Sequence, residues 1–398
     1  MANLHWRVPL QPYKTTAIAA KNIILAEFHG WVIVRLKTPE TNSMRAFCSF
    51  ALAVAIIPTL AGGQASVSAP KPNTPIEATT STTGPLDLDV VVSGHDGKPI
   101  AGLQQQDFSV YLDKEPQPIV GFHAVAATSS TEPVDTILLV DTVNTRFSNV
   151  AYERQQIDRF LKQNNGKLSQ PITLVILSDT NTQISQPSQD GNQLASVLDK
   201  AAIGIREVRR DTGFYGWTEQ FQISASALER LAAFEQTRPG RKLLIWISPG
   251  WPLLSGPEVE LSNKDQENLF NNLVALTATL RRARITLSSV DPLGTQDAIS
   301  YQTDFYQEFT KGVPSAKKMQ IGNLALQVLA LQSGGRVLNA SNDVTAQIAL
   351  AASDATAFYT LTVKSPPSER PNEYRAISVR VDKPGLTART RTVYYAQP

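Results

Sequence analysis

Asp141 is the residue of this chain whose type and position best suit site chemistry. It follows an apolar run over residues 136–140 and precedes small polar residues, Thr142 to Thr145. A continuous apolar run is typical of a strand buried on both faces, as in a parallel sheet. Ligands of open α/β sheets bind beyond the carboxyl ends of the strands, so Asp141 is the first candidate for function. The alternative interpretation is that Asp141 only caps the turn into the next helix.

Three further apolar runs end in polar residues in the same way. Residues 172–177 end at Asp179, residues 243–247 end at Ser248, and residues 285–290 end at Asp291. Because the carboxyl ends of parallel strands share one edge, we expect these residues to lie together. We name this edge the rim, and it comprises Asp141, Asn144, Thr145, Asp179, Ser248, Gly250, Trp251 and Asp291.

Two tryptophans of this region have different expected roles. Trp246 lies inside an apolar run, which favours a place in the core. Trp251 follows that run in a Gly-Trp-Pro turn, where it either contacts a partner or covers the sheet edge. Trp217 is a similar loop candidate beside Gly216.

Amphipathic stripes separate these apolar runs. Apolar residues recur at helical spacing near residues 150–161, 194–198, 223–234, 269–280, 324–331 and 344–352. Residues 336–338 read as a further strand, and residues 182–188 as a short edge strand. Strands that alternate with helices predict an α/β fold over residues 133–355, with a doubly wound, mainly parallel sheet.

Small antiparallel β units flank that domain, at residues 86–127 and 356–398. Apolar and polar residues alternate over 86–92 and 108–112, and Asp96-Gly97 predicts a hairpin turn between them. Asp87, Asp89, Asp96 and Asp107 lack the spacing of a calcium loop, so we interpret them as solvent-facing. Residues 357–363 and 377–381 alternate similarly. Whether the two units form one domain stays open.

The first 85 residues indicate export. From Met44-Arg45 an apolar stretch leads to small residues ending at Ala65, the pattern of a secretory signal peptide over 44–65. Residues 1–43 are then an upstream extension, and the Ser, Thr, Pro and Ala-rich residues 66–85 a flexible linker. A buried helix or an uncleaved anchor is the alternative for 44–65. We expect a secreted, periplasmic or cell-envelope protein with no stable membrane span after cleavage.

Composition excludes several classes of function. A formal net charge of +2 with dispersed charges gives no case for nucleic-acid binding. Cys48, the only cysteine, lies in the signal segment, so the mature chain has no disulfide or thiolate metal site. None of the four histidines falls within residues 133–355, which disfavours a Ser/His/Asp site or a histidine-bound zinc there.

Five short phrases in this order resemble the von Willebrand factor type A domain, and more closely a group of secreted bacterial proteins described as VWFA-related, abundant in acidobacteria. The phrases are residues 97–103 with Asp107-Phe108; 138–141 with Asn144-Thr145; 239–242 with 246–248; Gly334-Gly335-Arg336; and 384–386 with 394–396. They cover nearly everything after the linker.

The resemblance implies a metal-dependent adhesion site. Type A domains hold magnesium or manganese through an Asp-x-Ser-x-Ser motif, a distant Thr and a distant Asp. Here Asp141 and Thr145 match the first and last motif positions, whereas Val143 replaces the middle hydroxyl. Ser248-Pro249-Gly250 offers no carboxylate at the later acidic position, and Thr212 or Thr218 is the candidate for the distant Thr. We therefore expect a degenerate site, with Asp141 and Thr145 as the ligands of any Mg²⁺ or Mn²⁺.

The function implied is protein–protein interaction, as an adhesion or scaffolding module that binds an unknown protein partner at the rim. An architectural envelope protein with an inert rim is one alternative. A hydrolase using Asp141, Asp179 or Asp291 is another, which the lack of a nearby His, Cys or glycine-rich phosphate loop disfavours.

Overall fold

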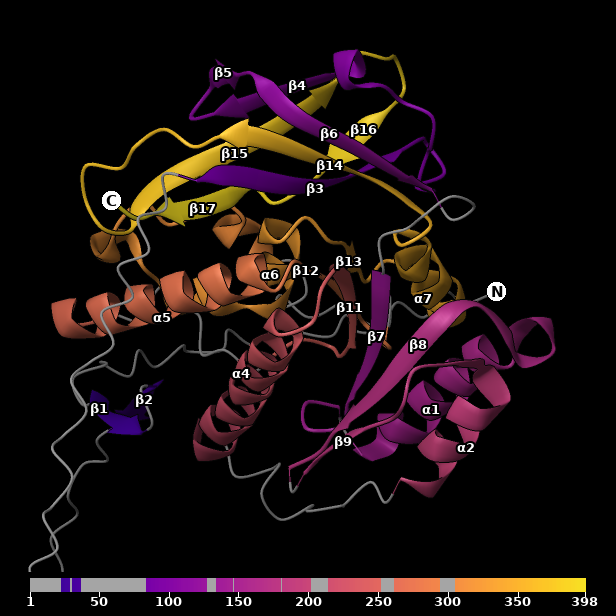
Figure 1. Cartoon of the computed structure of the whole chain (residues 1–398). Coiled ribbons are helices and arrows are strands. Elements are labelled where there is room, and N and C mark those ends of the chain that lie inside the picture. Colours follow the sequence, from indigo (N-terminus) through magenta and orange to yellow (C-terminus); the bar gives the residue numbers. More distant parts are fainter. Residues whose placement is uncertain are drawn as a thin grey trace, which may run out of the picture.

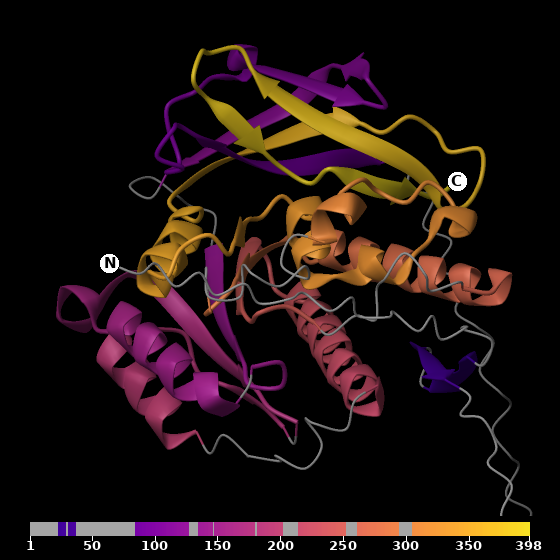
Figure 2. The same ribbon diagram turned by 180° about the vertical axis from the view of Figure 1, so that it is seen from behind.

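The structure is a computed structural model that describes residues 23–28, 31–36, 84–126, 134–145, 147–179, 181–201, 214–251, 261–293 and 305–398. Figure 1 shows two bodies, an α/β domain and, above it, a β-sandwich coloured purple and yellow. The view from behind in Figure 2 shows the same two layers. The sandwich therefore combines strands from before and after the α/β domain in the sequence.

A seven-stranded sheet organises the α/β domain, in the order β10-β8-β7-β11-β12-β13, with β9 paired to β8. Neighbours from β8 to β13 run parallel, while β9 and β10 run antiparallel to β8. The winding reverses between β7 and β11, as in doubly wound folds. This confirms the predicted doubly wound, mainly parallel sheet. The strands are β7 (Val134–Asp141), β8 (Lys167–Leu177), β9 (Thr182–Ile184), β10 (Ser188–Asp190), β11 (Arg241–Ile247), β12 (Ile285–Val290) and β13 (Val337–Leu338).

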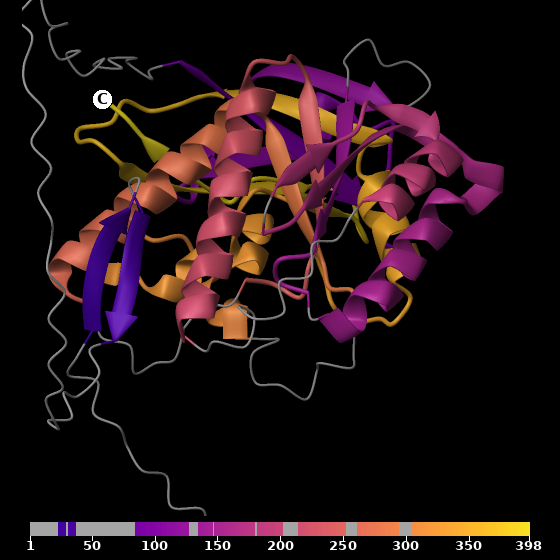
Figure 3. The ribbon, with the colours of Figure 1, turned by 90° about the horizontal axis from the view of Figure 1, so that it is seen from below.

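Helices cover both faces of this sheet, as the view from below shows (Figure 3). Ile137 and Leu139 of β7 pack into a core with α4, α5 and α6, whereas Leu138 and Val140 face a second core with α1, α2 and α7. Burial on both faces is why the strand reads as an uninterrupted apolar run. The helices are α1 (Phe147–Leu161), α2 (Gly191–Lys200), α4 (Phe214–Gln236), α5 (Asn263–Arg282), α6 (Leu326–Gln332) and α7 (Val344–Ser353).

The β-sandwich consists of two four-stranded sheets, ordered β16-β3-β14-β6 and β17-β15-β4-β5. Each sheet contains strands from both flanking segments, so these segments fold as one unit. Phe108 and Tyr359 meet in its core with ring centroids 5.0 Å apart. The strands are β3 (Pro85–Ser93), β4 (Phe108–Leu112), β5 (Glu115–Gln117), β6 (Ile119–Ala126), β14 (Ala357–Lys364), β15 (Glu373–Val381), β16 (Thr387–Arg389) and β17 (Val393–Ala396).

The predicted hairpin turn at Asp96-Gly97 is present, but it does not join β3 to β4. Ser93 bridges Pro99 in antiparallel fashion, and Ile100 N donates to Val92 O at 2.8 Å. Gly97 forms a tight turn, with φ +74° and its N–H donating to Gly94 O at 3.0 Å. However, β3 and β4 lie in different sheets, and β3 pairs with β14 and β16. The chain between them binds Tyr359, whose hydroxyl donates to Ile100 O at 2.8 Å and accepts from Leu103 N at 3.1 Å. Pairing with distant strands, not the local turn, sets the partner of β3.

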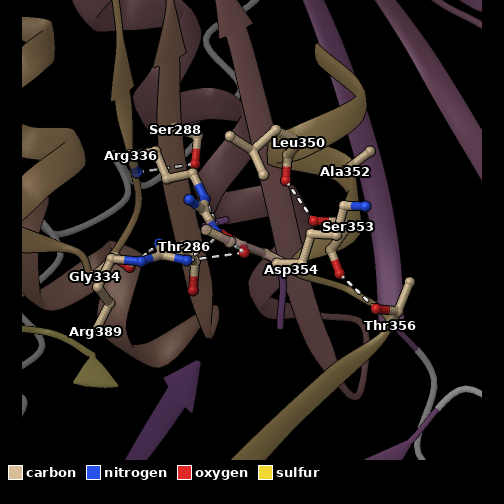
Figure 4. Close-up of polar contacts among 12 residues, drawn as sticks. Thr286, Ser288, Gly334, Arg336, Leu350, Ala352, Ser353, Asp354, Thr356 and Arg389 are labelled. Carbon is tan, nitrogen blue, oxygen red and sulfur yellow. Dashed lines mark hydrogen bonds and ion pairs between the residues drawn. The ribbon is translucent and has the colours of Figure 1, made fainter. Parts of the chain in front are cut away.

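A buried charge cluster fixes the sandwich to the α/β domain (Figure 4). Asp354, fully buried at the end of α7, accepts from Arg336 at 2.7 and 3.0 Å and from Arg389 of β16 at 2.8 and 2.9 Å. Arg336 also donates to Gly97 O at 2.5 Å. Arg241 donates to the backbone oxygen of Asp354 at 2.8 Å. One carboxylate thus binds arginines from both bodies.

The N-terminal predictions fall largely outside the described residues. The signal peptide 44–65 and linker residues 66–83 are not among them, and β3 begins at Pro85, the last residue assigned to the linker. Within residues 1–43, β1 (Ile23–Phe28) and β2 (Trp31–Leu36) form an antiparallel pair. Among the described helices, none combines the length and apolarity that a membrane crossing requires.

Candidate functional site

Asp141 ends β7 beside the point where the winding of the sheet reverses, and its side chain is completely buried. Oδ1 accepts from the backbone N–H groups of Val143 at 3.0 Å and Asn144 at 3.1 Å. Oδ2 accepts from Asn144 Nδ2 at 2.6 Å and Trp246 Nε1 at 2.8 Å. A carboxylate has about four acceptor positions, and four N–H donors occupy those of Asp141. The side chain also caps its turn, as the alternative interpretation proposed.

The environment of Asp141 acts on its pKa in two opposing directions. Burial raises the pKa, because an ionised carboxylate loses its hydration. Hydrogen bonds from Asn144, Trp246 and Ser248 lower it, and burial has the larger effect. The donors around Asp141 are therefore what makes an ionised carboxylate tolerable in this place.

Trp246 occupies the core, which confirms the prediction for this residue. It is fully buried, and its ring packs edge-on against Trp251 with centroids 5.5 Å apart. Trp251 is 7% exposed and also packs against Phe221 at 5.8 Å. Of its two predicted roles, Trp251 therefore covers the sheet edge. Trp217 lies in α4, and its side chain is outside the described part of the structure.

Asn144 and Thr145 connect the turn after β7 to two helices. Asn144 Nδ2 donates to Ser224 Oγ of α4 at 2.8 Å, in addition to its bond to Asp141. Thr145 Oγ1 donates to the backbone oxygen of Asp141 at 2.8 Å, and the Thr145 side chain also bonds to Glu153 of α1. Thr145 is buried, so its hydroxyl serves the internal network.

Glu153 is a buried acid beneath the rim that sequence reasoning missed. It is 2% exposed, and its Oε1 has no hydrogen-bond partner among the described residues. Burial raises the pKa of Glu153 well above its ordinary value, the negative charges of Asp141 and Asp291 raise it further, and the bond to Thr145 opposes the shift. Asp291 itself is buried, and its Oδ1 accepts from Leu293 N at 2.9 Å.

The remaining rim residues have separate roles. Ser248 is buried; its Oγ accepts from Gly250 N at 3.1 Å, and its side chain bonds to Asp141. Gly250 has φ +109°, a conformation that disfavours other residues. Asp179 is partly buried, and its Oδ1 has no donor among the described residues. The structure thus joins Asp141, Asn144, Thr145 and Ser248 directly, while no contact described here joins Asp179 to them.

The donor set around Asp141 does not fit Mg²⁺ or Mn²⁺. These ions need oxygen ligands with free lone pairs, whereas N–H donors occupy the Asp141 carboxylate. Val143 is 2% exposed and packs in the core, so the middle motif position contributes no ligand. No group of three or more His, Cys, Asp or Glu residues in the described part of the chain is arranged to hold a metal. Thr212 and the side chain of Thr218 lie outside that part.

Glu153 could be predicted from the sequence, whereas the hydrogen bond from Trp246 to Asp141 could not. Glu153 lies at helical spacing from Val150, Ile157 and Phe160, so it belongs to the buried face of α1. That spacing was enough to find it. The indole N–H of Trp246 had no such signal, because it reaches Asp141 only through the pairing of β11 with β7.

Comparisons with known proteins returned distant structural likenesses only. No protein-family model and no curated protein sequence matches this chain. An aerotolerance-related membrane protein from Bacteroides fragilis is 12% identical with a TM-score of 0.31, over 56% of this chain and 99% of that one. The SpRpn10 VWA domain is 15% identical with a TM-score of 0.25, over 55% and 95%. The pilus adhesin SpaC from Lactobacillus rhamnosus GG is 8% identical with a TM-score of 0.32, over 74% and 48%. At these values the fold assignment rests on the strand order and register given above.

Proposed function

We propose that this chain is a secreted or cell-envelope protein-interaction module whose rim binds a basic segment of a partner protein without a metal ion. The observation that carries the proposal is that two rim residues each have an acceptor oxygen with no donor among the described residues: Asn144 Oδ1 and Asp179 Oδ1. Lysine and arginine side chains have only donors, so they complement such oxygens. Asn144 and Asp179 are both partly exposed residues, and Asp179 carries the negative charge.

The metal-free part of the proposal follows from Asp141. In a metal-dependent adhesion site the ion supplies the positive charge that attracts a carboxylate from the partner. Here the N–H groups of Trp246, Asn144 and Val143 stabilise the Asp141 carboxylate inside the protein by hydrogen bonds and leave its negative charge in place. Without an ion the rim carries negative charge, which favours a partner segment with positively charged side chains.

Binding rather than catalysis is the use that this rim supports. The acceptor positions of Asp141 are occupied, so it is poorly placed to take a proton from a nucleophile. His95 and His123, the histidines among the described residues, belong to the sandwich segments. The signal-like residues 44–65 support the envelope location.

Affinity capture from an envelope fraction, repeated with EDTA, tests this function. We expect a partner to bind the wild-type chain equally well with and without EDTA, and Asp179→Lys to abolish binding. Glu369→Lys is the matched control, since it makes the same charge change at an exposed residue of the sandwich segment. Binding that requires a divalent ion, or that Asp179→Lys and Glu369→Lys reduce equally, would overturn the proposal.

A further inference from the structure

β6 is the free edge of a sandwich sheet. It is the last strand in the order β16-β3-β14-β6, and within the described residues it pairs only with β14. A free edge exposes backbone N–H and C=O groups that can pair with another strand. β6 has eight residues, none of them charged and none a proline, and Val120 is 52% exposed.

The other three edges of the sandwich have features that prevent such pairing. β5 has three residues and includes Glu115 and Pro116. β16 also has three residues, and Arg389 is bound to Asp354. β17 is buried, with Tyr395 packed against Phe270 of α5 at 5.6 Å. Short length, charge, proline and a covering helix are common protections of edge strands, and β6 has none of these four. The register of β6 against β14 shifts at Val120, near the start of the strand, and is regular from Gly121 to Ala126.

The direction of the β6 backbone groups follows from one side-chain contact. Thr390 Oγ1 donates to the backbone oxygen of Asp89 at 2.8 Å, so the backbone groups of Asp89 face β16. Asp89 lies opposite Thr360 of β14, and Thr360 lies opposite His123 of β6. Because backbone groups alternate in direction along antiparallel strands, those of Thr360 face β6 and those of His123 face β14. The backbone groups of Phe122, Ala124 and Ala126 consequently face the free edge.

We propose that β6 pairs antiparallel with β6 of a second copy of this chain, joining the two sheets into one continuous sheet of a symmetric dimer. Twofold symmetry brings the same strand of the two copies together, and an uncharged strand makes this contact without like-charge repulsion. With Ala124 opposite Ala124 of the second copy, Phe122 lies opposite Ala126, and all three have outward backbone groups. Gly121, Ala124 and Ala126 are small and allow the strands to approach.

The dimer uses a different surface from the rim and stands independently of the proposed function. β6 belongs to the sandwich, whereas the rim lies at the carboxyl ends of the α/β strands (Figure 1). Loss of the dimer and loss of rim binding are therefore separable outcomes.

Sedimentation velocity of the full chain tests the proposal. We expect a dimer for the wild type and for Ser378→Lys, an exposed position on the inner strand β15. Ala124→Pro removes an outward N–H from each copy, and we expect the dissociation constant to rise about thirty-fold, roughly a factor of five per hydrogen bond. Ala124→Lys keeps the N–H and brings two positive charges together, so it dissociates the dimer even if the proline variant fails to fold.

A cysteine cross-link identifies the strand register. In a Cys48→Ser background the chain has no other cysteine, and Ala124→Cys then forms an intermolecular disulfide on mild oxidation, because residues opposite each other in paired strands are within disulfide reach. A wild-type monomer at concentrations up to about 100 μM overturns the proposal. A dimer that persists in Ala124→Lys, or that Ala124→Cys does not cross-link, places the interface elsewhere and overturns it equally.

Discussion

Replacing Trp246 with phenylalanine removes the indole N–H that Asp141 accepts at 2.8 Å, in a site with no exposure to solvent. A hydrogen bond to a charged group contributes about 1.5–3 kcal/mol to stability. The smaller phenyl ring also leaves part of the indole volume empty, at a cost of about 1–2 kcal/mol from the buried atoms removed. We therefore expect Trp246→Phe to lower the free energy of unfolding by about 2.5–5 kcal/mol.

Trp251→Phe is the matched control for the packing contribution. Trp251 is 7% exposed and packs against Trp246, but its Nε1 has no hydrogen-bond partner among the described residues. The same substitution there deletes the same atoms without removing a bond from Asp141. Loss of the unpartnered N–H offsets part of the packing cost, so we expect a loss of at most about 1–2 kcal/mol. The difference between the two variants measures the bond to Asp141.

Urea denaturation followed by far-ultraviolet circular dichroism measures both variants, since tryptophan fluorescence changes with the substitutions. Trp246→Phe should lower the free energy of unfolding more than Trp251→Phe at any pH where Asp141 is ionised. This difference should disappear as the pH falls through the pKa of Asp141. Because burial raises that pKa, the difference begins to disappear at a higher pH than for an ordinary aspartate. If Trp246→Phe costs no more than Trp251→Phe at neutral pH, the indole N–H does not stabilise the ionised Asp141 carboxylate.

Three further predictions concern the buried acids and the metal. Glu153→Gln should stabilise the protein at pH 7 and make little difference near pH 4 in thermal melts, because folded Glu153 keeps its proton above the pH at which the unfolded residue ionises. A pH profile of stability that is unchanged by the substitution would contradict this. Asp354→Asn should cost about 3–5 kcal/mol in urea denaturation, since it leaves Arg336 and Arg389 without their buried carboxylate, and a loss below about 1 kcal/mol would contradict this. Calorimetric titration with Mg²⁺ or Mn²⁺ should give no binding heat in the wild type, and heat that Asp141→Ala abolishes would show that Asp141 is a ligand after all.

The sequence predicted the α/β sheet better than the sandwich, for a physical reason. Each central strand is buried on both faces and lies near strands joined to it by one helix, so local patterns are enough. β6 contains Gly121 and His123 and shows no regular alternation, and it was not predicted. The turn at Asp96-Gly97 was predicted correctly, but β3 and β4 do not pair, because the partners of β3 come from the other end of the chain.

At the rim, the sequence predicted where Asp141 lies in the sheet but not which groups bind its carboxylate. The end of an apolar run placed Asp141 correctly at the carboxyl edge of the sheet. What occupies its acceptor positions depends on Trp246 from another strand, so it follows from strand register rather than from the spacing of the motif.

The phrases that resemble type A proteins contribute mainly to the contact between the two bodies. A side chain at Gly335 would place its Cβ 1.8 Å from Leu287 O, so glycine lets the chain pass β12 and carry Arg336 to Asp354 and to Gly97 O. Arg241 binds the backbone of the same Asp354 and lies over the Phe358 ring at 4.6 Å.

Three of the five phrases thus meet around one buried carboxylate, whereas the phrase at the rim departs from the metal motif at Val143. A resemblance carried by such contacts concerns how the α/β domain and the sandwich are joined. It does not determine a ligand, because the atoms that join the two bodies are not those of the rim. The chemistry of any partner must therefore be inferred from the rim itself, where four N–H donors already bind Asp141, and Asn144 and Asp179 each retain an oxygen with no donor among the described residues.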